Sequence, residues 1–316
     1  MKLYYKGMLA VYLEGGEVSV REIPRPARPF GFALLRLLAG GICNTDLELR
    51  RGYYGFAGTP GHEFVAEVVE ADNRDLVGKR VVGEINLACG DCDWCRRGLG
   101  RHCPTRTVLG IVNQPGAFQE YFTLPEANLS VVPDEIATDR AIFTEPLAAA
   151  CEILDQVAIP PHETVAVLGD GKLGLLIAMV LHAHGYRVHH FGRHPEKLAL
   201  SPGETSTETP PPHAYEWTVD ATGSAEGLRT AVATTRPRGT IVLKSTVHGL
   251  VPVDTAPVIV NELTLVGSRC GRFEASLPLL GLVPVERMIA GRFPLSEAPA
   301  AFAAAEGALK ILLENR

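Results

Sequence analysis

Short runs of apolar residues, several of them alternating with polar ones, recur through the first 145 residues of the chain. These runs lie near residues 18–23, 33–39, 64–69, 80–83 and 118–124, and turn-forming residues separate them. A period of two residues is typical of β-strands that bury one face. The N-terminal part of the chain is therefore predicted to be rich in β-structure.

The period changes at Pro146. Leu147, Ala150, Cys151 and Leu154 follow with the spacing of one helical face. Proline is well tolerated as the first residue of a helix, because its missing N–H has no partner there. We therefore predict a helix that begins at Pro146.

A different alternation of elements follows. A continuous apolar strand at 164–168 leads into a glycine-rich turn, a helix with an apolar face over 173–181 and a second strand at 187–191. Strand, helix and strand in this order form a βαβ unit, whose crossover makes the sheet parallel. Residues 217–221 and 240–243 are predicted to add two further strands to that sheet.

Two segments remain outside these units. Residues 201–213 are rich in Pro, Ser and Thr, which predicts a surface loop. Residues 297–305 are predicted to form an alanine-rich helix, and 309–313 are a short apolar end.

Length and charge limit the possible functions. A chain of 316 residues with 46% hydrophobic residues is long enough for two cores, and 30 basic against 36 acidic residues leave no basic face for nucleic acid. Apolar stretches are interrupted by charges, and Glu14 and Glu17 lie where a signal peptide would be apolar. We expect a soluble cytoplasmic protein with no nucleic-acid or membrane partner.

Four of the seven cysteines lie within 15 residues: Cys89, Cys92, Cys95 and Cys103. Four thiolates on one loop can close a tetrahedral shell around zinc, which is typical of a structural site in a reducing compartment. Two alternatives remain, namely four unrelated cysteines or an iron–sulfur cluster. The iron–sulfur motif has three residues before its last cysteine, whereas seven are present here.

A second set of candidate ligands comes from separate loops. Cys43 lies in Gly-Ile-Cys-Asn-Thr-Asp, His62 and Glu63 follow Pro-Gly, and Glu145 precedes Pro146. Three protein ligands with one exchangeable position are typical of catalytic zinc. Taken singly, these residues fit a buried cysteine, a loop histidine and a helix-capping glutamate better than a set of metal ligands.

The glycine turn carries a third motif. Gly169, Gly171 and Gly174 have the G-x-G-x-x-G spacing between an apolar strand and an amphipathic helix. This arrangement allows a tight turn, a close approach of backbone to a pyrophosphate, and helix–strand packing. With the intervening Lys172 and Leu173, the turn is predicted to bind a dinucleotide.

The end of the second strand bears on which dinucleotide is bound. An NAD-binding fold places an acidic residue there, about 20 residues beyond the glycine turn, to hold the ribose 2′-hydroxyl. Here Gly192 takes that position and Arg193 and His194 follow it, with Lys197 one helical turn on. A glycine would leave room for a 2′-phosphate that Arg193 could bind. We therefore predict NADP, with NAD as the alternative.

These motifs together resemble the zinc-containing medium-chain dehydrogenase/reductase superfamily, which includes alcohol, sorbitol, glucose and threonine dehydrogenases. The resemblance covers nearly the whole chain, since 41–46, 61–63, 89–103, 145–148 and 169–174 occur in the order of that family. It implies a GroES-like, β-rich catalytic domain at 1–146 and 268–316. It also implies a Rossmann domain at 147–267 that is somewhat trimmed after Lys197.

The resemblance also implies roles for single residues. It implies one structural zinc on the four cysteines and one catalytic zinc on Cys43, His62 and Glu145, with Glu63 as an alternate ligand. Thr45 would hydrogen-bond the substrate oxygen, and Asp46 would orient His62. The cofactor-binding positions in this resemblance also include Thr222, in Asp-Ala-Thr-Gly, and Lys310, a basic residue that would reach the pyrophosphate.

The function that follows is hydride transfer between a small alcohol or polyol, or the matching carbonyl compound, and a nicotinamide dinucleotide. We expect a homo-oligomer, either a dimer or a tetramer. Two other classes remain as alternatives: a dinucleotide-binding or regulatory protein without catalysis, and a zinc-ribbon nucleic-acid module, which the acidic balance disfavours. Substrate identity depends on loops such as 51–59, whose aromatic residues either line the pocket or pack the loop.

Overall fold

The computed structural model describes residues 7–246 and 251–316, and it divides the chain into two compact units. Unit 1 comprises residues up to Glu145 and from Ile289 to the C-terminus, and unit 2 spans Pro146–Met288. Within the described residues, no helix is both long and apolar enough to cross a membrane.

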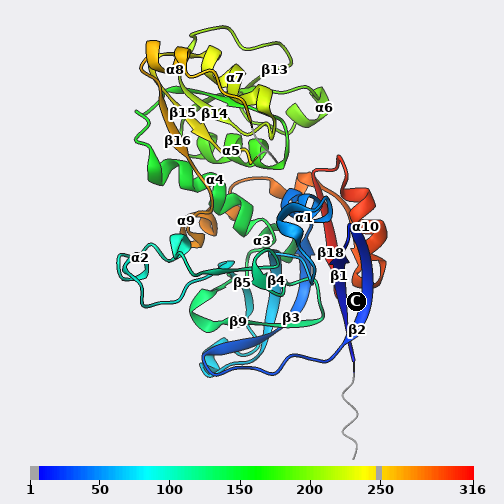
Figure 1. The fold of residues 1–316 in the computed structure, drawn as a ribbon. Coiled ribbons are helices and arrows are strands. Elements are labelled where there is room, and N and C mark those ends of the chain that lie inside the picture. Colours follow the sequence, from blue (N-terminus) through cyan, green and yellow to red (C-terminus); the bar gives the residue numbers. More distant parts are fainter. Residues whose placement is uncertain (1–6, 247–250) are drawn as a thin grey trace, which may run out of the picture. The chain divides into compact units, whose positions relative to one another are not determined.

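Unit 1 is built mainly from strands, as the alternating pattern predicts (Figure 1). Its largest sheet has the order β10-β5-β4-β3-β18-β17, and β9 also pairs with β3. β17 and β18 are parallel, and the other pairs are antiparallel. The bounds of these strands are Phe32–Gly41 (β3), Glu63–Glu70 (β4), Arg80–Gly83 (β5), Tyr121–Pro125 (β9), Leu129–Val131 (β10), Ile289–Pro294 (β17) and Lys310–Glu314 (β18).

Smaller elements complete unit 1. β1 pairs with β2 in a hairpin, and β6, β7 and β8 form a small sheet beside the cysteine-rich loop. Their bounds, with those of the helices, are Met8–Glu14 (β1), Glu17–Ile23 (β2), Asn86–Leu87 (β6), Thr107–Leu109 (β7), Asn113–Gln114 (β8), Asn44–Arg50 (α1), Asp93–Arg96 (α2), Thr138–Ala141 (α3) and Ala298–Ala305 (α10).

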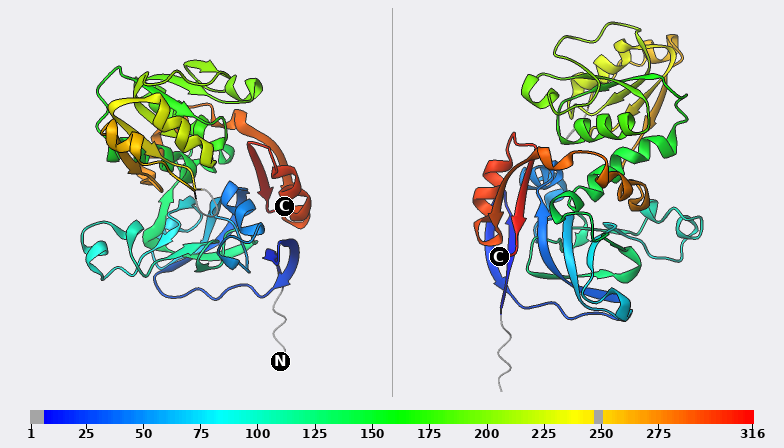
Figure 2. Two further views of the ribbon diagram at one scale, coloured as in Figure 1. Left: turned by 45° about the horizontal axis from the view of Figure 1, so that its top comes forward. Right: turned by 180° about the vertical axis from the view of Figure 1, so that it is seen from behind.

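Unit 2 contains one parallel sheet of six strands in the order β13-β12-β11-β14-β15-β16. This is the doubly wound order of a Rossmann fold. Figure 1 and the two views of Figure 2 show α5 on one face of the sheet and α7 with α8 on the other. The strands are Thr164–Leu168 (β11), Arg187–Phe191 (β12), Glu204–Ser206 (β13), Tyr215–Asp220 (β14), Thr235–Leu243 (β15) and Thr264–Gly267 (β16).

The helices of unit 2 begin with α4, whose first two residues belong to unit 1. One face of the sheet buries Ala166, Leu168 and Phe191 against Ala231 and Val232 of α7. Burial of this apolar surface is the main stabilising contribution to the unit. The helices are Thr144–Gln156 (α4), Lys172–Ala183 (α5), Pro195–Leu198 (α6), Ala225–Thr234 (α7), Ala256–Val260 (α8) and Phe273–Ser276 (α9).

Three local predictions need correction. α4 begins at Thr144, two residues before Pro146, and a short strand, β13, lies inside the segment predicted to be a loop. The apolar C-terminal end is a strand, β18. β13 has only three residues, too few to show a period, and a short continuous apolar run such as 309–313 does not by itself distinguish a strand from another buried segment.

The trimming expected after Lys197 is present. α6 has only four residues, and residues 207–214, which join β13 to β14, contain no helix. The sheet thus retains all six strands of the doubly wound order, but the connection from β12 to β14 provides only the short helix α6.

The boundary between the units lies later than the resemblance implies. Residues 268–288 pack with unit 2 rather than unit 1. The Lys244 ammonium donates to Ser268 Oγ at 3.0 Å and to the carbonyl of Arg269 at 2.8 Å, and Arg272 pairs with Asp155 of α4. These side-chain contacts attach the segment to the Rossmann unit. They could not be predicted from the sequence, because they follow no repeating pattern.

Candidate active site

Cys43 lies immediately before α1, at the position that caps the helix. Asp46, three residues on, turns back so that its Oδ2 accepts the N–H of Cys43 at 2.8 Å. This is the reciprocal arrangement of a capping box, which satisfies a backbone donor that would otherwise have no partner. The Cys43 thiol is thereby presented at a fixed end of the helix, with its Sγ 3.8 Å from Thr45 Oγ1.

The start of β4 brings in the next two residues. Gly61 precedes His62 with a φ of 104°, which favours glycine, and a Cβ there would overlap the ring of Phe118. The Gly61 N–H donates to Asp46 Oδ1 at 3.2 Å. One carboxylate, that of Asp46, therefore joins the α1 loop to the β4 loop.

Cys43, His62 and Glu63 converge, with one ligand atom from each within 4.8 Å of the others. His62 and Glu63 are buried, and His62 Nδ1 lies 3.4 Å from Asp46 Oδ1 without forming a hydrogen bond. Burial disfavours the charged imidazole, but Asp46 and Cys43 together raise the pKa of His62 well above its ordinary value. The structure thus assembles a thiol, an imidazole and a carboxylate from residues 43–63.

Glu145 lies at the start of α4, outside this group of three. Loss of hydration raises the pKa of its carboxyl to about 7, with His62 opposing the rise and Glu63 adding to it. These mutual effects indicate that Glu145 faces the same site from another element.

Lys310 was expected at the cofactor pyrophosphate, but its ammonium contacts the Glu63 carboxylate and its side chain is only 1% exposed. The ammonium also lies 5.4 Å from the centre of the Phe143 ring. Burial opposes its charge, yet Glu63 holds the pKa of Lys310 above its ordinary value. The pairing was not predicted from sequence because 247 residues separate the partners, and the pyrophosphate role stays a prediction.

The four-cysteine lobe is local and more exposed. Sγ–Sγ distances are 3.5 Å for Cys92–Cys95 and Cys89–Cys103, 3.8 Å for Cys92–Cys103 and 3.9 Å for Cys89–Cys95. Four sulfurs bound tetrahedrally at about 2.3 Å from zinc lie roughly 3.8 Å apart. The lobe therefore has room for one ion of this size, and a cluster of several iron atoms would need wider spacing.

The glycine turn has the geometry that its motif predicts. Gly169 has a φ of 106°, and a Cβ there would lie 2.6 Å from the carbonyl oxygen of Ala221. A Cβ on Gly174 would overlap the carbonyl of Gly169, whereas one on Gly171 would meet nothing within 4 Å. The backbone around Gly171 is thus open to a ligand where α5 begins, just before Lys172 and Leu173.

Thr222 lies in the turn after β14. Its N–H and hydroxyl both donate to Asp220 Oδ1, at 3.0 and 2.8 Å. Because β11 and β14 are adjacent and parallel, this turn lies beside the glycine turn. That edge is where open α/β sheets bind ligands.

The surroundings of Gly192 differ from the prediction. The space that a side chain would take is filled by Asp170 of the glycine turn, since a Cβ on Gly192 would lie 2.5 Å from Asp170 Oδ2. The expected room beside Gly192 is therefore absent. Arg193 is exposed, and among the described residues its guanidinium has no hydrogen-bonding or ionic partner.

The comparisons with known proteins agree with this geometry. Residues 31–134 match the family model of the alcohol dehydrogenase GroES-like domain. An L-threonine 3-dehydrogenase from Streptomyces avermitilis is 31% identical over 89% of this chain and 91% of its own. The chain belongs to the zinc-containing medium-chain dehydrogenase/reductase superfamily.

Other members extend the comparison. An erythritol/L-threitol dehydrogenase from Mycolicibacterium smegmatis is 34% identical over 61% of this chain and 60% of its own. The structure of alcohol dehydrogenase TADH from Thermus sp. ATN1 matches with a TM-score of 0.87 and 30% identity, over 98% of this chain and 100% of that one. The GroES-like and Rossmann architecture of the superfamily is thereby confirmed, and the protein is an oxidoreductase of the dehydrogenase class.

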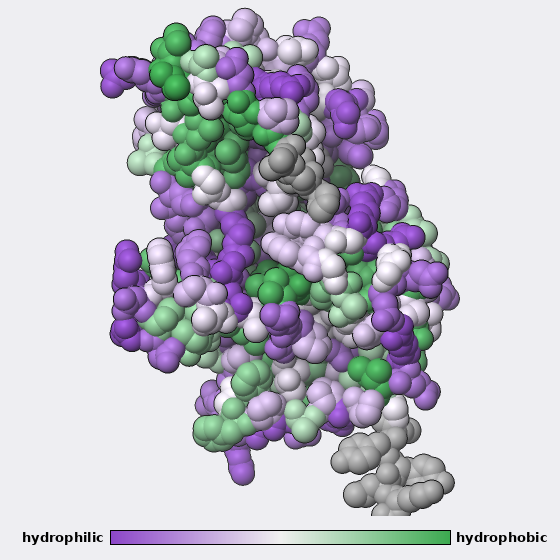
Figure 3. All heavy atoms as spheres, viewed as in Figure 1, coloured by the Kyte–Doolittle hydropathy of each residue, from purple (hydrophilic) through white to green (hydrophobic). Residues whose placement is uncertain are grey.

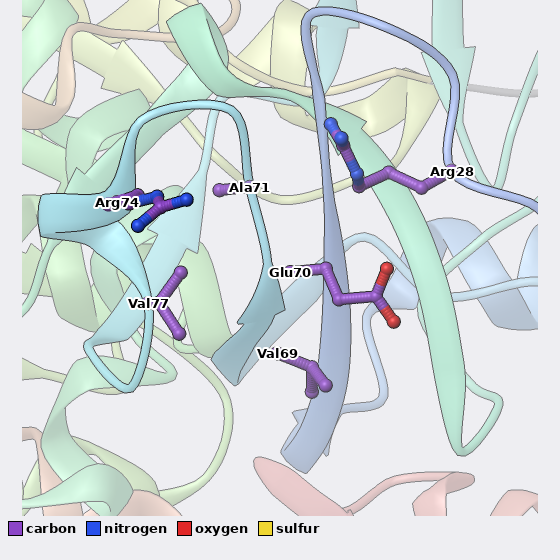
Figure 4. A pocket seen from close by; sticks show the side chains of 6 residues that line it. All are labelled: Arg28, Val69, Glu70, Ala71, Arg74 and Val77. Atoms are coloured by element: carbon purple, nitrogen blue, oxygen red, sulfur yellow. The ribbon is translucent and has the colours of Figure 1, made fainter.

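A surface hollow of unit 1 lies apart from both ligand clusters. That hollow, of about 530 Å³, lies at the end of β4 and contains side chains of both charges (Figure 4). Arg28 in it pairs with Asp72 at 2.7 Å. It shares no residue with either ligand cluster. Its lining residues are Arg28, Val69, Glu70, Ala71, Arg74 and Val77.

Proposed function

We propose that this protein is a zinc-dependent, NADP(H)-linked dehydrogenase of small alcohols or polyols. The observation that carries the proposal is the convergence of Cys43, His62 and Glu63 within 4.8 Å in a chain of the dehydrogenase superfamily. A thiol, an imidazole and a carboxylate are the donors that zinc prefers, and three of them leave one position for a substrate.

The residues present fit two zinc ions per chain. Cys89, Cys92, Cys95 and Cys103 would hold one, with sulfur spacings suited to a closed shell. Cys43 and His62 would hold the other together with Glu145, while Glu63 is the alternate ligand. The ion pair with Lys310 supports this order, because it occupies the Glu63 carboxylate and leaves that of Glu145 available.

Zinc bound at the second site would act as a Lewis acid toward a substrate oxygen, and the dinucleotide would exchange the hydride. The protein's own residues would position the ligand loops and transfer the proton. Asp46 holds the loops of Cys43 and His62 through two backbone N–H groups. Thr45, whose hydroxyl lies beside the Cys43 thiol, would accept a proton from the substrate hydroxyl and pass it outward.

The assignment of NADP rests on Arg193 and Lys197, the two cations after β12. Arg193 is exposed and free to pair with a 2′-phosphate in a bidentate manner. A protein from Sinorhizobium meliloti 1021, assigned as a zinc-binding dehydrogenase and solved with NADP, has a TM-score of 0.89 at 29% identity, over 98% of this chain and 99% of its own. The rspB alcohol dehydrogenase from Escherichia coli CFT073, at 25% identity, was solved with NADH. Experiments on the cofactor must therefore compare NADP with NAD.

The substrate class follows from the relatives. Several of them are named for polyols or for a hydroxy amino acid, including erythritol, D-altritol and L-threonine. We propose a small polyhydroxylated substrate oxidised at a secondary alcohol. We also keep the expected cytoplasmic location as a proposal, because all seven cysteines are free and the ligand thiols require reducing conditions.

A panel of alcohols and polyols, each with NADP and with NAD, tests the function when it is combined with elemental analysis. The expected result is turnover that depends on zinc, with about two zinc ions per chain. Dinucleotide binding without turnover on any substrate would instead indicate a regulatory protein. One zinc per chain, or visible iron–sulfur absorbance, would contradict the two-site assignment.

Self-association is the last part of the proposal. The sheet order of unit 2 ends at β16, and side chains exposed there include Ile259 at 72%, Val260 at 79% and Leu265 at 38%. Apolar residues gather over β16 and α8 in Figure 3. An apolar edge strand is suited to pairing with a second copy. Sedimentation should give a dimer or tetramer that Leu265→Glu weakens, and a monomeric wild type would refute this part.

A further inference from the structure

The glycine turn and the turn after β12 are joined by side chains in both directions. His190 of β12 is fully buried, and its Nε2–H donates to the carbonyl of Gly169 at 2.8 Å. In return, Asp170 Oδ2 accepts the backbone N–H groups of Arg193 and His194, both at 2.6 Å. The glycine turn is thus held by a side chain of β12, and the turn after β12 is held by a side chain of the glycine turn.

The remaining contacts make this connection rigid. Ser201 Oγ lies 2.7 Å from His190 Nδ1 and also donates to the carbonyl of Pro202 at 3.2 Å. Burial lowers the pKa of the His190 imidazole, which favours its neutral form. The Asp170 side chain is 10% exposed, and His194 Nδ1 lies 3.1 Å from its Oδ1. The donors around this carboxylate outweigh its burial and lower the pKa of Asp170.

The contacts also explain why residue 192 is glycine. Its φ lies outside the left-handed region, so backbone conformation does not require glycine there. A Cβ would instead lie 2.5 Å from both Cβ and Oδ2 of Asp170. Gly192 and Asp170 are therefore complementary: the glycine leaves a space, and the carboxylate fills it.

We propose that Asp170 is a positioning residue for cofactor discrimination, which fixes the backbone of Arg193 and His194 so that the Arg193 guanidinium meets the 2′-phosphate. The inference rests on the proposed NADP linkage and deepens it. Asp170 takes up both main-chain donors of the turn, so the phosphate must be recognised by side chains. A flexible backbone at Arg193 would lose binding free energy to ordering when the phosphate binds, whereas a backbone that Asp170 already holds loses less.

A second effect of Asp170 opposes the first. Its negative charge lies close to the position proposed for the 2′-phosphate and would repel it. Two substitutions separate positioning from repulsion. Asp170→Asn retains one oxygen, which can replace Oδ2 as acceptor of both N–H groups, and its amide nitrogen can donate to His194 Nδ1. Asp170→Ala removes the charge and the acceptor together.

The measured quantity is the 2′-phosphate preference. It is obtained from the affinities for adenosine 2′,5′-bisphosphate and AMP by calorimetry, and from kcat/KM with NADP and NAD. Asp170→Ala should lower the preference about tenfold, because most of the strength of the charge-assisted pair between Arg193 and the 2′-phosphate depends on how the guanidinium is placed. Asp170→Asn should keep the preference of the wild type or exceed it. Glu196→Gln, which removes an exposed carboxylate from α6 directly after this turn, is the control and should change nothing.

Several outcomes would overturn the proposal. A rise in preference for Asp170→Ala would show that repulsion alone operates, and no change would show that Arg193 is positioned without Asp170. An equal fall for Asn and Ala would exclude positioning through the oxygen acceptor. If the wild type itself lacks a 2′-phosphate preference, the NADP assignment fails. If the preference exists and survives in Asp170→Ala, only the positioning role fails.

Discussion

The two ligand clusters of unit 1 differ in how the chain brings them together. The four-cysteine lobe comes from residues 89–103, one short segment, and Cys89 in it is exposed. The other cluster combines Cys43, His62 and Glu63 from two loops, and α4 adds Glu145. The candidate ligands of the lobe are all thiols, whereas those of the second site include carboxylates. One of these, Glu63, pairs with the buried Lys310.

This difference matches what a structural metal site and a catalytic metal site each require of the fold. A closed shell of local thiolates stabilises its own loop and needs no support from the rest of the fold. A site with an exchangeable position needs rigid ligands and controlled charge, which several packed elements supply through hydrogen bonds such as those of Asp46. Breaking each cluster should therefore affect different measurements.

The largest effect on turnover is expected from substitution of the ligands at the second cluster, which combines Cys43, His62 and Glu145. Cys43→Ala and His62→Ala should each lower turnover by about a thousandfold or more, because a Lewis acid contributes several kcal/mol to transition-state stabilisation. Dinucleotide affinity, measured by fluorescence titration, should stay within about twofold, since the glycine turn lies in unit 2. Parallel loss of dinucleotide affinity would instead indicate misfolding.

The next effect concerns the buried pair. Lys310→Met should lower the free energy of unfolding by about 3 kcal/mol, because it leaves the Glu63 charge buried without a partner. Urea denaturation measures this loss. Adding Glu63→Leu should restore most of it, and a double variant as unstable as the single one would show that the charges are not coupled.

The roles of the two carboxylates come third. If Glu145 is the third ligand, Glu145→Gln should weaken zinc retention against a chelator about 100-fold, while Glu63→Gln, a change beside the metal, costs about tenfold. Zinc release followed with a chromophoric chelator measures both. The reverse order would exchange the two assignments.

The smallest effect on catalysis is expected from the local lobe. Cys95→Ser should leave kcat per folded molecule within about twofold but lower the melting temperature by roughly 5 °C or more, because a structural metal contributes to folding free energy. Calorimetry and active-site titration measure the two quantities. An unchanged melting temperature would argue against a metal in the lobe.

Several features of this protein were predictable from the sequence because they are local. The β-rich first part, the βαβ unit and the glycine turn follow from periods of two and 3.6 residues and from glycine positions, and all three are present. The four cysteines could be grouped for the same reason, since 15 residues of loop cannot separate them widely. β13 could not be identified because three residues show no period, and β18 could not because its short apolar run lacks the flanking βαβ context that marked β11 and β12 as strands.

Tertiary structure alone decided the features that depend on distant partners. Lys310 reaches Glu63 because β18 pairs with the end of β3, next to the start of β4, and Asp170 reaches Gly192 because β11 and β12 are parallel neighbours. The residue type at each position was visible in the sequence, but its partner was not. From sequence alone, a charged side chain is expected to be exposed to solvent. Whether it is buried depends on elements that are distant in the sequence but pack against it in the fold.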